Sequence, residues 1–133
     1  MEDLNLKMVA LRVSRSALDS ILGYARACYP REAILLLRGK ASGEDTTISE
    51  VVVPPLSVHG YSFSNLPLHM LPIDFSILGM VHSHPSGGLR PSVQDLNSFY
   101  GKIMMIVAYP FTEQDLAAFN SKGEQVPYTI VSS

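Results

Sequence analysis

The apolar residues of this chain fall into short runs separated by polar turns, and their spacing predicts the order of the elements. Short apolar runs bounded by turn residues are typical of strands. Such runs occur at residues 7–13, 33–37, 47–53, 77–81, 103–108, 116–119 and 128–131, with polar turns at 40–45 and 122–123. The sequence therefore predicts a sheet that takes up most of the chain.

A helix is expected between the first two of these strands. Apolar residues within 17–25 have the i, i+1, i+4, i+5 spacing of an amphipathic helix, and Ser14 is suited to be its N-cap. The helix should end near Tyr29, because Pro30 disfavours a helical conformation of the residue before it. Its expected function is packing.

The length and composition indicate one domain, residues 1–133, with a substantial core. Hydrophobic residues make up 47% of the chain and charged residues 17%, and the mean hydropathy is positive. Two explanations of this apolar surplus stay open. One is a tightly packed small domain with short loops, and the other is a surface that binds a partner or a second copy in a homodimer.

The charge balance and the cysteine content exclude several classes of function. Ten basic and 12 acidic residues give a net charge of −2 without any basic run, so no nucleic-acid partner is expected. Cys28 is the single cysteine, which excludes an intrachain disulfide and a multi-cysteine metal site. The acidic start differs from a signal peptide, and no apolar run approaches the ~20 residues of a membrane span. We therefore expect a soluble, cytoplasmic protein that does not bind membranes.

Residues 81–95 carry the side chains with candidate chemistry. His82 and His84 follow an apolar run that is typical of a buried strand. Residues i and i+2 of a strand point to the same face, so both imidazoles can reach one point. The pair Gly87-Gly88 then allows the backbone a tight reversal.

A carboxylate follows on a second predicted helix, expected over about residues 92–100. Pro91-Ser92 is typical of a helix start, with Ser92 as the N-cap, and Asp95 lies in the first turn. The strand, turn and helix should bring this carboxylate close to the two histidines. Two imidazole nitrogens and one carboxylate oxygen, with a fourth position open, are the ligands of a catalytic zinc site.

Each of these signals also has an explanation without a metal. Ser92-x-x-Asp95 could be a capping box with Asp in the place of Glu, and histidines inside proteins are usually only hydrogen-bonded. The occurrence of both patterns around one glycine-rich turn favours the metal site, with His82, His84 and Asp95 as its ligands.

The run His82-Ser83-His84-Pro85, six further residues, and Ser92-x-x-Asp95 together resemble the motif of the JAMM (MPN-plus, Mov34/PAD-1 type) zinc metalloproteases. That motif also includes an upstream glutamate at the start of an apolar strand. Glu32 stands in this position, immediately before residues 33–37. The order of the predicted elements fits the resemblance over nearly the whole chain.

The resemblance implies both a fold and a set of roles. The fold would be a single MPN/JAMM-like domain of the α/β (α+β) class, with a mixed, mostly antiparallel sheet flanked by two main helices. One Zn²⁺ per chain would be bound by His82, His84 and Asp95. Glu32 would act as the general base on water, and Ser92 would help to stabilise the oxyanion.

The activity implied by the resemblance is zinc-dependent hydrolysis of an amide, an isopeptide bond to a ubiquitin-like modifier. A small sulfur-carrier protein processed at its C-terminal tail is a second substrate of the same class. RadC-type proteins stay open as an alternative, because their motif is similar to the run His84-Pro85-Ser86-Gly87, although the missing basic patch argues against them. A non-catalytic scaffold or binding module of the same fold also stays open, although it would need none of the motif residues.

Residues 56–75 have no clear period and contain His59 and His69. A loop of this length in a small domain is usually functional, and in the resembled family an insertion here contacts the ubiquitin-like partner. Neither histidine has a short spacing to another ligand, so both are weak candidates for a metal. A second insertion of the family looks absent, because only residues 97–102 separate the second helix from the next strand.

Overall fold

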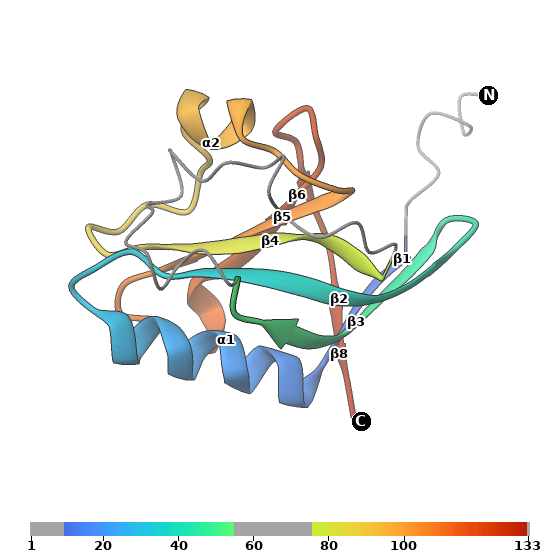
Figure 1. Ribbon diagram of the computed structural model, residues 1–133, viewed down its shortest axis with the longest axis horizontal. Coiled ribbons are helices and arrows are strands. Elements are labelled where there is room, and N and C mark those ends of the chain that lie inside the picture. The colour runs from blue at the N-terminus through green and yellow to red at the C-terminus, as the bar shows by residue number, and fades with distance from the viewer. Residues whose placement is uncertain (1–9, 55–75, 133) are drawn as a thin grey trace.

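The computed structural model describes residues 10–54 and 76–132, which form an eight-stranded mixed sheet between a long and a short helix (Figure 1). The strands lie in the order β7-β6-β5-β4-β2-β3-β1-β8. In chain order the elements are β1 (Ala10–Ser14), α1 (Arg15–Cys28), β2 (Ile34–Ser42), β3 (Asp45–Val52), β4 (Ile77–His84), α2 (Val93–Asn97), β5 (Ile103–Ala108), the 3₁₀ helix η5 (Glu113–Asp115), β6 (Leu116–Phe119), β7 (Gln125–Val126) and β8 (Thr129–Val131). Four strand pairs are antiparallel and three are parallel, so the predicted fold class is confirmed.

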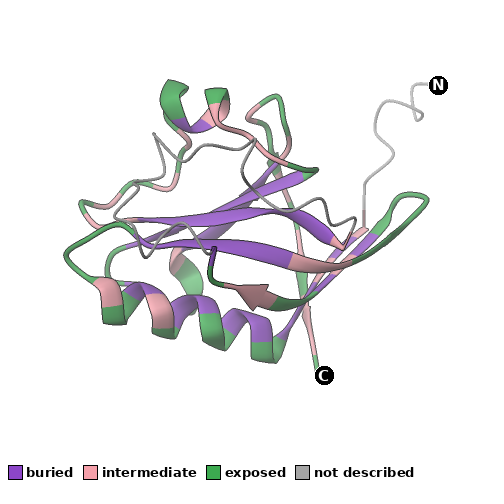
Figure 2. Ribbon diagram, viewed as in Figure 1, coloured by how far each residue is buried: buried purple, intermediate pink, exposed green. Residues whose placement is uncertain are grey.

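Helix α1 forms as its sequence predicts. Ser14 is the N-cap, and its Oγ accepts the Ala17 N–H at 3.1 Å. The helix ends at Cys28, and Tyr29 is the C-cap before Pro30. Its buried residues all belong to the apolar cluster that it shares with the sheet: Ala17, Leu18, Ile21, Leu22 and Ala25. Figure 2 shows the side of α1 toward the sheet as buried. The predicted helix is confirmed, and the strand before it is confirmed from residue 10 onward.

Strand β4 lies in the middle of the sheet, antiparallel to β2 and parallel to β5. His82 is opposite Ile34 on one side and Ile106 on the other, so the register places the histidine-bearing end of β4 deep in the structure. Gly79 permits the close approach of β5, because a Cβ at this position would collide with the Ile103 carbonyl. A buried central strand therefore carries the candidate ligands.

Alternating residues of the central strands form one apolar cluster on each face of the sheet. Leu35, Val81 and Val107 pack against α1, whereas Met80 and Ile106 belong to the cluster on the opposite face. Figure 2 shows β4 and β5 buried along nearly their whole length. Much of the apolar surplus of the sequence thus lies in the core of the described residues, which supports the tightly packed domain.

Helix α2 is shorter than expected. The sequence predicts a helix over about residues 92–100, but α2 ends at Asn97. Phe99 and Tyr100 instead pack against the apolar cluster on the face of the sheet opposite α1. Gly101 then adopts a φ of 82°, which is outside the helical region. The burial of these aromatic side chains ends the helix after little more than one turn.

Two boundaries in the sheet also differ from the prediction. Strand β2 continues to Ser42, which pairs with Asp45, so the turn expected at residues 40–45 is reduced to two residues. The predicted hairpin turn at Lys122-Gly123 forms, but it joins β6 to β7, which is not predicted, and not to the run 128–131. The last strand begins at Thr129 rather than Tyr128 and pairs with β1.

The segment 56–75, with His59 and His69, lies outside the described residues, as do residues 7–9 of the predicted first strand. Neither α1 nor any other helix in the described part of the chain has the length and apolar character needed to cross a membrane.

Candidate metal centre

Strand β4 directs both histidines to the face of the sheet opposite α1. His82 shares this face with Met80, whereas Val81, one residue earlier, packs against α1. His82 is 1% exposed, and His84 at the end of the strand is partly exposed. The two ring centroids lie 5.1 Å apart. The i, i+2 spacing thus brings the imidazoles together at the end of a buried strand.

The glycine-rich turn after β4 orients the ring of His84. Gly87 and Gly88 have φ values of 92° and 94°, a conformation that is favourable only for glycine. The reversal brings the Gly88 carbonyl back to the ring, where it accepts a hydrogen bond from His84 Nδ1–H at 2.8 Å. With its proton on Nδ1, the neutral ring presents the lone pair of Nε2, as is usual for a metal-binding histidine whose other nitrogen is hydrogen-bonded.

A complete capping box at the start of α2 fixes Asp95. Ser92 Oγ accepts the Asp95 N–H at 3.0 Å, and Asp95 Oδ2 accepts the Ser92 N–H at 2.8 Å. Asp95 is only 7% exposed, and its carboxylate faces both histidines. The capping box and the ligand cluster are therefore not alternatives, because the cap holds the carboxylate where a metal ligand is needed.

The three side chains have the spacing of ligands around one small cation. Asp95 Oδ1 lies 3.6 Å from His82 Nδ1, and Asp95 Oδ2 lies 3.2 Å from His84 Nε2. One candidate ligand atom from each residue lies within 4.8 Å of the others. In a tetrahedral site with metal–ligand bonds of about 2.0–2.1 Å, neighbouring ligand atoms are about 3.3 Å apart. The donors and their spacing fit Zn²⁺.

The contact between His84 and Asp95 also favours a cation. When His84 Nδ1 donates to Gly88, its neutral Nε2 is an acceptor, and it faces an acceptor oxygen of Asp95 at 3.2 Å. Two facing acceptors need a positive charge between them, either a second proton on the ring or a metal ion. The additional proximity of His82 makes the metal ion the better explanation, since a proton can join only two of the three groups.

The environment of His82 keeps its imidazole neutral. Burial lowers the pKa of His82 to about 4, against the raising effect of the Asp95 carboxylate, and His84 lowers it further. Desolvation disfavours the charged imidazolium form in this way. The neutral ring of His82 can act as a metal ligand at neutral pH.

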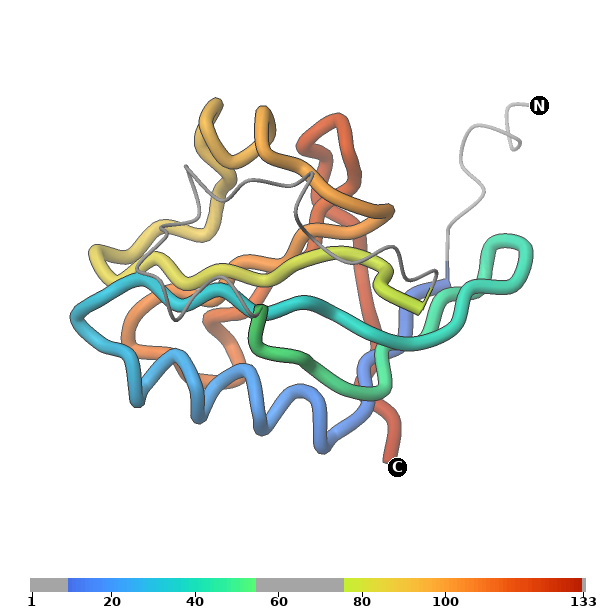
Figure 3. The backbone as a smooth tube through the Cα atoms, viewed as in Figure 1, coloured from blue at the N-terminus to red at the C-terminus, as the bar shows by residue number. Residues whose placement is uncertain are grey.

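A polar cleft of about 300 Å³ opens beside this cluster. Glu32, from the loop between α1 and β2, and Ser92, at the start of α2, line it together with His84 and Asp95. Figure 3 shows why these segments meet, because the loop before β2 and the turn after β4 lie at the same end of the sheet. The structure thus places all five motif residues at one end of the sheet.

The surroundings of Glu32 differ from the expectation. The sequence predicts that Glu32 stands immediately before an apolar strand at residues 33–37, but β2 begins at Ile34, two residues after Glu32, and Glu32 is exposed. Glu32 lies in the loop before β2. Its neighbour Ala33 is hydrogen-bonded to Ser83 of β4, at the end of the pairing between the two strands. The side chain therefore reaches the cleft from the solvent side.

Two contributors to the site are not predicted from the sequence. The Gly88 carbonyl orients His84, and Ser83 Oγ accepts the Ala33 N–H at 2.7 Å. The glycine pair is a visible signal of the turn, but it does not say which carbonyl meets the ring. The contact of Ser83 depends on the register between β2 and β4, which no local pattern gives.

Comparisons with known proteins are consistent with this geometry. The chain matches the family of prokaryotic homologs of the JAB domain over residues 14–122. A probable metalloprotease from Haloferax volcanii is 33% identical over 119 residues, which cover 84% of this chain and 74% of that protein.

The chain belongs to the JAMM family.

Solved structures support this assignment. A JAB1/MPN domain protein from Archaeoglobus fulgidus has a TM-score of 0.69 and 32% identity to this chain, over 92% of this chain and 98% of that one. A structure described as JAMM, a metalloprotease-like zinc site in the proteasome and signalosome, has a TM-score of 0.66 and 32% identity, over 92% and 99%. Both structures are similar to this chain along nearly their whole length.

The JAMM assignment confirms the resemblance drawn from the motif, the fold class and the expectation of one Zn²⁺ per chain. The chain is thus a metallohydrolase of this family, with a group formed by His82, His84 and Asp95 that suits the metal. The roles of Glu32 and Ser92 and the nature of the substrate stay predictions.

Proposed function

We propose that this JAMM protein is an isopeptidase that hydrolyses amide bonds at the C-terminus of ubiquitin-like proteins. The observation that carries the proposal is the common cleft, in which Glu32 and Ser92 face the same space as His84 and Asp95. A metal cluster alone could have a structural role. Hydrolysis also requires a proton acceptor and an oxyanion donor beside the metal, and the Glu32 carboxylate and the Ser92 hydroxyl are in the position for these roles.

The metal supplies one part of the chemistry. When bound by His82, His84 and Asp95, Zn²⁺ acts as a Lewis acid that lowers the pKa of water to about 7, so that hydroxide is available near neutral pH. The protein keeps these ligands ready through the Gly88 carbonyl and the capping box. His82 contributes a neutral ring, because its burial disfavours the proton.

Glu32 is the proposed general base and then general acid. Its carboxylate takes a proton from the attacking water in the cleft and delivers it to the nitrogen of the leaving amine. An exposed carboxylate next to the ligands, but outside their mutual contacts, can carry out both transfers. The position of Glu32 in a loop is compatible with this task if the loop is held firmly to the sheet.

Ser92 is the proposed oxyanion donor. The lone pairs of its Oγ accept the Asp95 N–H, but this bond does not use the hydroxyl proton. That proton can therefore be donated to the oxygen that becomes negative when the carbonyl is attacked. Loss of one such donor typically reduces kcat by about 10²–10³-fold.

The location of the cleft supports a macromolecular substrate with an extended tail. The exposed residues that surround it are Glu32, before β2, Ser86, in the turn after β4, and Ser92 and Gln94, at the start of α2. The cleft is therefore open rather than enclosed. Membership of the JAMM family supports the proposed substrate class. A sulfur-carrier protein with a similar tail would present the same kind of amide.

The test is hydrolysis by purified, zinc-loaded protein of a fluorogenic C-terminal amide of a ubiquitin-like protein and of isopeptide-linked conjugates. We expect cleavage that stops with a chelator and returns when zinc is added. A zinc-loaded, folded protein that cleaves none of these substrates would contradict the proposal and favour the non-catalytic binding module.

A further inference from the structure

The residue between the two histidines contacts the loop that carries Glu32. Ser83 is fully buried and lies directly after His82 on β4. Its Oγ accepts the N–H of Ala33 at 2.7 Å, and its own N–H donates to the Ala33 carbonyl at 3.0 Å. Both backbone polar groups of Ala33 are therefore bound to one residue, and that residue stands between two metal ligands.

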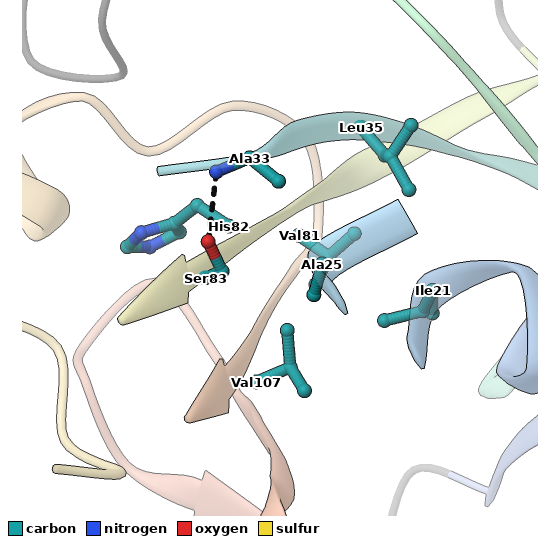
Figure 4. A pocket seen from close by; sticks show the side chains of 8 residues that line it. All are labelled: Ile21, Ala25, Ala33, Leu35, Val81, His82, Ser83 and Val107. Carbon is teal, nitrogen blue, oxygen red and sulfur yellow. Dashed lines mark hydrogen bonds between the residues drawn. The ribbon is translucent and has the colours of Figure 1, made fainter. Parts of the chain in front are cut away.

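This contact takes the place of the last step of the strand ladder. In a regular antiparallel pair of strands, every second pair of facing residues exchanges two backbone N–H···O=C bonds. Ile34 faces His82, so Ala33 faces Ser83, but the Ala33 N–H bonds to the serine side chain instead of a carbonyl. Figure 4 shows the Ser83 hydroxyl directed at the Ala33 nitrogen, at the point where the chain before β2 leaves the sheet.

We propose that Ser83 is a positioning residue that fixes the distance between Glu32 and the metal ligands. Glu32 is bonded covalently to Ala33, so two hydrogen bonds at Ala33 set the position and the direction of the peptide from which the carboxylate extends. Ser83 does not join the ligands, because side chains alternate along β4 and its own points to the face of α1. The inference rests on the proposed role of Glu32.

The magnitude of the effect follows from the geometry of proton transfer. A displacement of about 1 Å in a reacting group can reduce the rate about 10²-fold. With one of the two bonds removed, Ala33 keeps its carbonyl contact to Ser83 and can rotate about it, and the exposed side chain of Glu32 moves with it. We therefore expect the hydroxyl of Ser83 to affect kcat more than the binding of substrate or metal.

A small cavity of about 10 Å³ beside Ser83 makes a conservative replacement feasible. It is lined by Ile21 and Ala25 of α1 and by Val107 of β5, and it has the size of roughly one water molecule (Figure 4). A threonine at position 83 keeps the hydroxyl, and its additional methyl group can occupy this space. Ser83→Thr is thus the rescue variant, and Ser83→Ala removes the bond.

The experiment compares Ser83→Ala, Ser83→Thr and Val107→Ala, each alone and with Glu32→Gln. Val107→Ala enlarges the same cavity but leaves the hydroxyl in place, so it controls for a general loss of packing. Hydrolysis of the fluorogenic amide gives kcat and KM, and elemental analysis gives the zinc content. In protein loaded with Co²⁺, pseudocontact shifts of the Glu32 and Ala33 signals report their position relative to the metal without any turnover.

For Ser83→Ala we expect kcat to fall about 10-fold or more, with unchanged zinc content, KM within about twofold, and altered shifts of Glu32 and Ala33. Ser83→Thr and Val107→Ala should keep kcat within about threefold and the wild-type shifts. In the Glu32→Gln background, Ser83→Ala should change the residual rate less than twofold, because the group that it positions is gone.

Unchanged shifts in Ser83→Ala, or an equal loss of kcat with and without Glu32, would overturn the inference. A wild-type protein without turnover would instead contradict the proposed function. The cobalt shifts would still decide whether Ser83 fixes Glu32 relative to the metal.

Discussion

On one face of the sheet, α1 runs along the strands for 14 residues and buries five apolar side chains. On the other face, the five-residue α2 and a glycine-rich turn leave a cleft of about 300 Å³ beside two histidines and a carboxylate. The first face is mostly apolar and stabilises the fold, with Ser83 as a buried polar residue that is hydrogen-bonded to Ala33. The second face is covered only by the short helix α2 and the glycine-rich turn. Hydrogen bonds to backbone atoms hold its polar side chains: His84 is bonded to the Gly88 carbonyl, and Asp95 to the Ser92 N–H.

The difference indicates a division of tasks across a single sheet. The central strand β4 serves both faces, because Val81 packs in the cluster that contains α1, whereas His82 and His84 point to the opposite face. Changes on the face of α1 should therefore alter stability without altering the metal site. Changes on the opposite face should alter the metal and the catalysis.

The largest expected effect is the loss of zinc in His84→Ala. Wild-type protein should contain about one zinc per chain, and the variant should lose nearly all of it, because one of three ligands and the contact to Asp95 are removed. Elemental analysis after dialysis measures this. Arg90→Ala, an exposed position in the same loop, is the control and should retain its zinc. Equal zinc in wild type and in the double His82/His84 alanine variant would exclude the site.

On the face of α1, Leu18→Ala should lower the free energy of unfolding by about 2–5 kcal/mol. Leu18 is fully buried against the sheet, so the change removes apolar contacts and leaves a cavity. Zinc per folded chain should stay at one. Urea unfolding with elemental analysis measures both, and Ser20→Ala, exposed on the same helix, should change stability by less than about 0.5 kcal/mol. Loss of zinc in Leu18→Ala would show that the two faces are not independent.

The metal-free protein should become less stable as the pH falls from about 6.5 to about 4. The folded-state pKa of His82 is lowered to about 4, so the unfolded chain takes up a proton first on acidification. The contribution of the neutral ring is fully present above about pH 6.5 and is lost through this window, by about 3 kcal/mol.

Urea unfolding of chelator-treated protein at pH 7, 5.5 and 4 measures this dependence. His82→Gln cannot be protonated at this position, so its stability should change less over the same range. Parallel pH profiles in the two proteins would contradict the assigned environment of His82.

The two roles of Ser92 can be separated by substitution. Ser92→Asp can still cap α2 but has no hydroxyl, so it should stay folded with kcat reduced about 10²-fold or more. Ser92→Asn caps as well, and its amide can replace part of the lost donor, so it should keep more activity. Kinetics together with thermal unfolding distinguish the roles. Turnover close to wild type in Ser92→Asp would leave Ser92 as a helix cap only.

The arrangement of β4, the turn and the cap could be predicted because each depends on local sequence. His82 and His84 share a face through the two-residue period of a strand, and Ser92 caps a helix with its own side chain. The end of α2 could not be predicted in this way. The aromatic residues after the helix, Phe99 and Tyr100, pack against an apolar cluster whose members are brought together only by the fold.

Contacts between distant segments were not accessible from the sequence. The bond from Ala33 to Ser83 joins residues 50 positions apart and depends on the register of β2 against β4. The exposure of Glu32 is related to the same hydrogen bond, because the pairing of β2 with β4 ends at Ala33 and Glu32 lies outside it. The sequence could suggest that Glu32 and the histidines meet, but it could not show how the loop is held.

The most direct test of the central claim is the zinc content and the turnover of Glu32→Gln. The account places Glu32 in the cleft beside the ligands but not among them, so the variant should keep about one zinc per chain and a wild-type fold. Its kcat on the fluorogenic amide should fall about 10²-fold or more, because the proton acceptor is lost. A variant that loses its zinc, or one that hydrolyses the substrate as fast as wild type, would contradict the account.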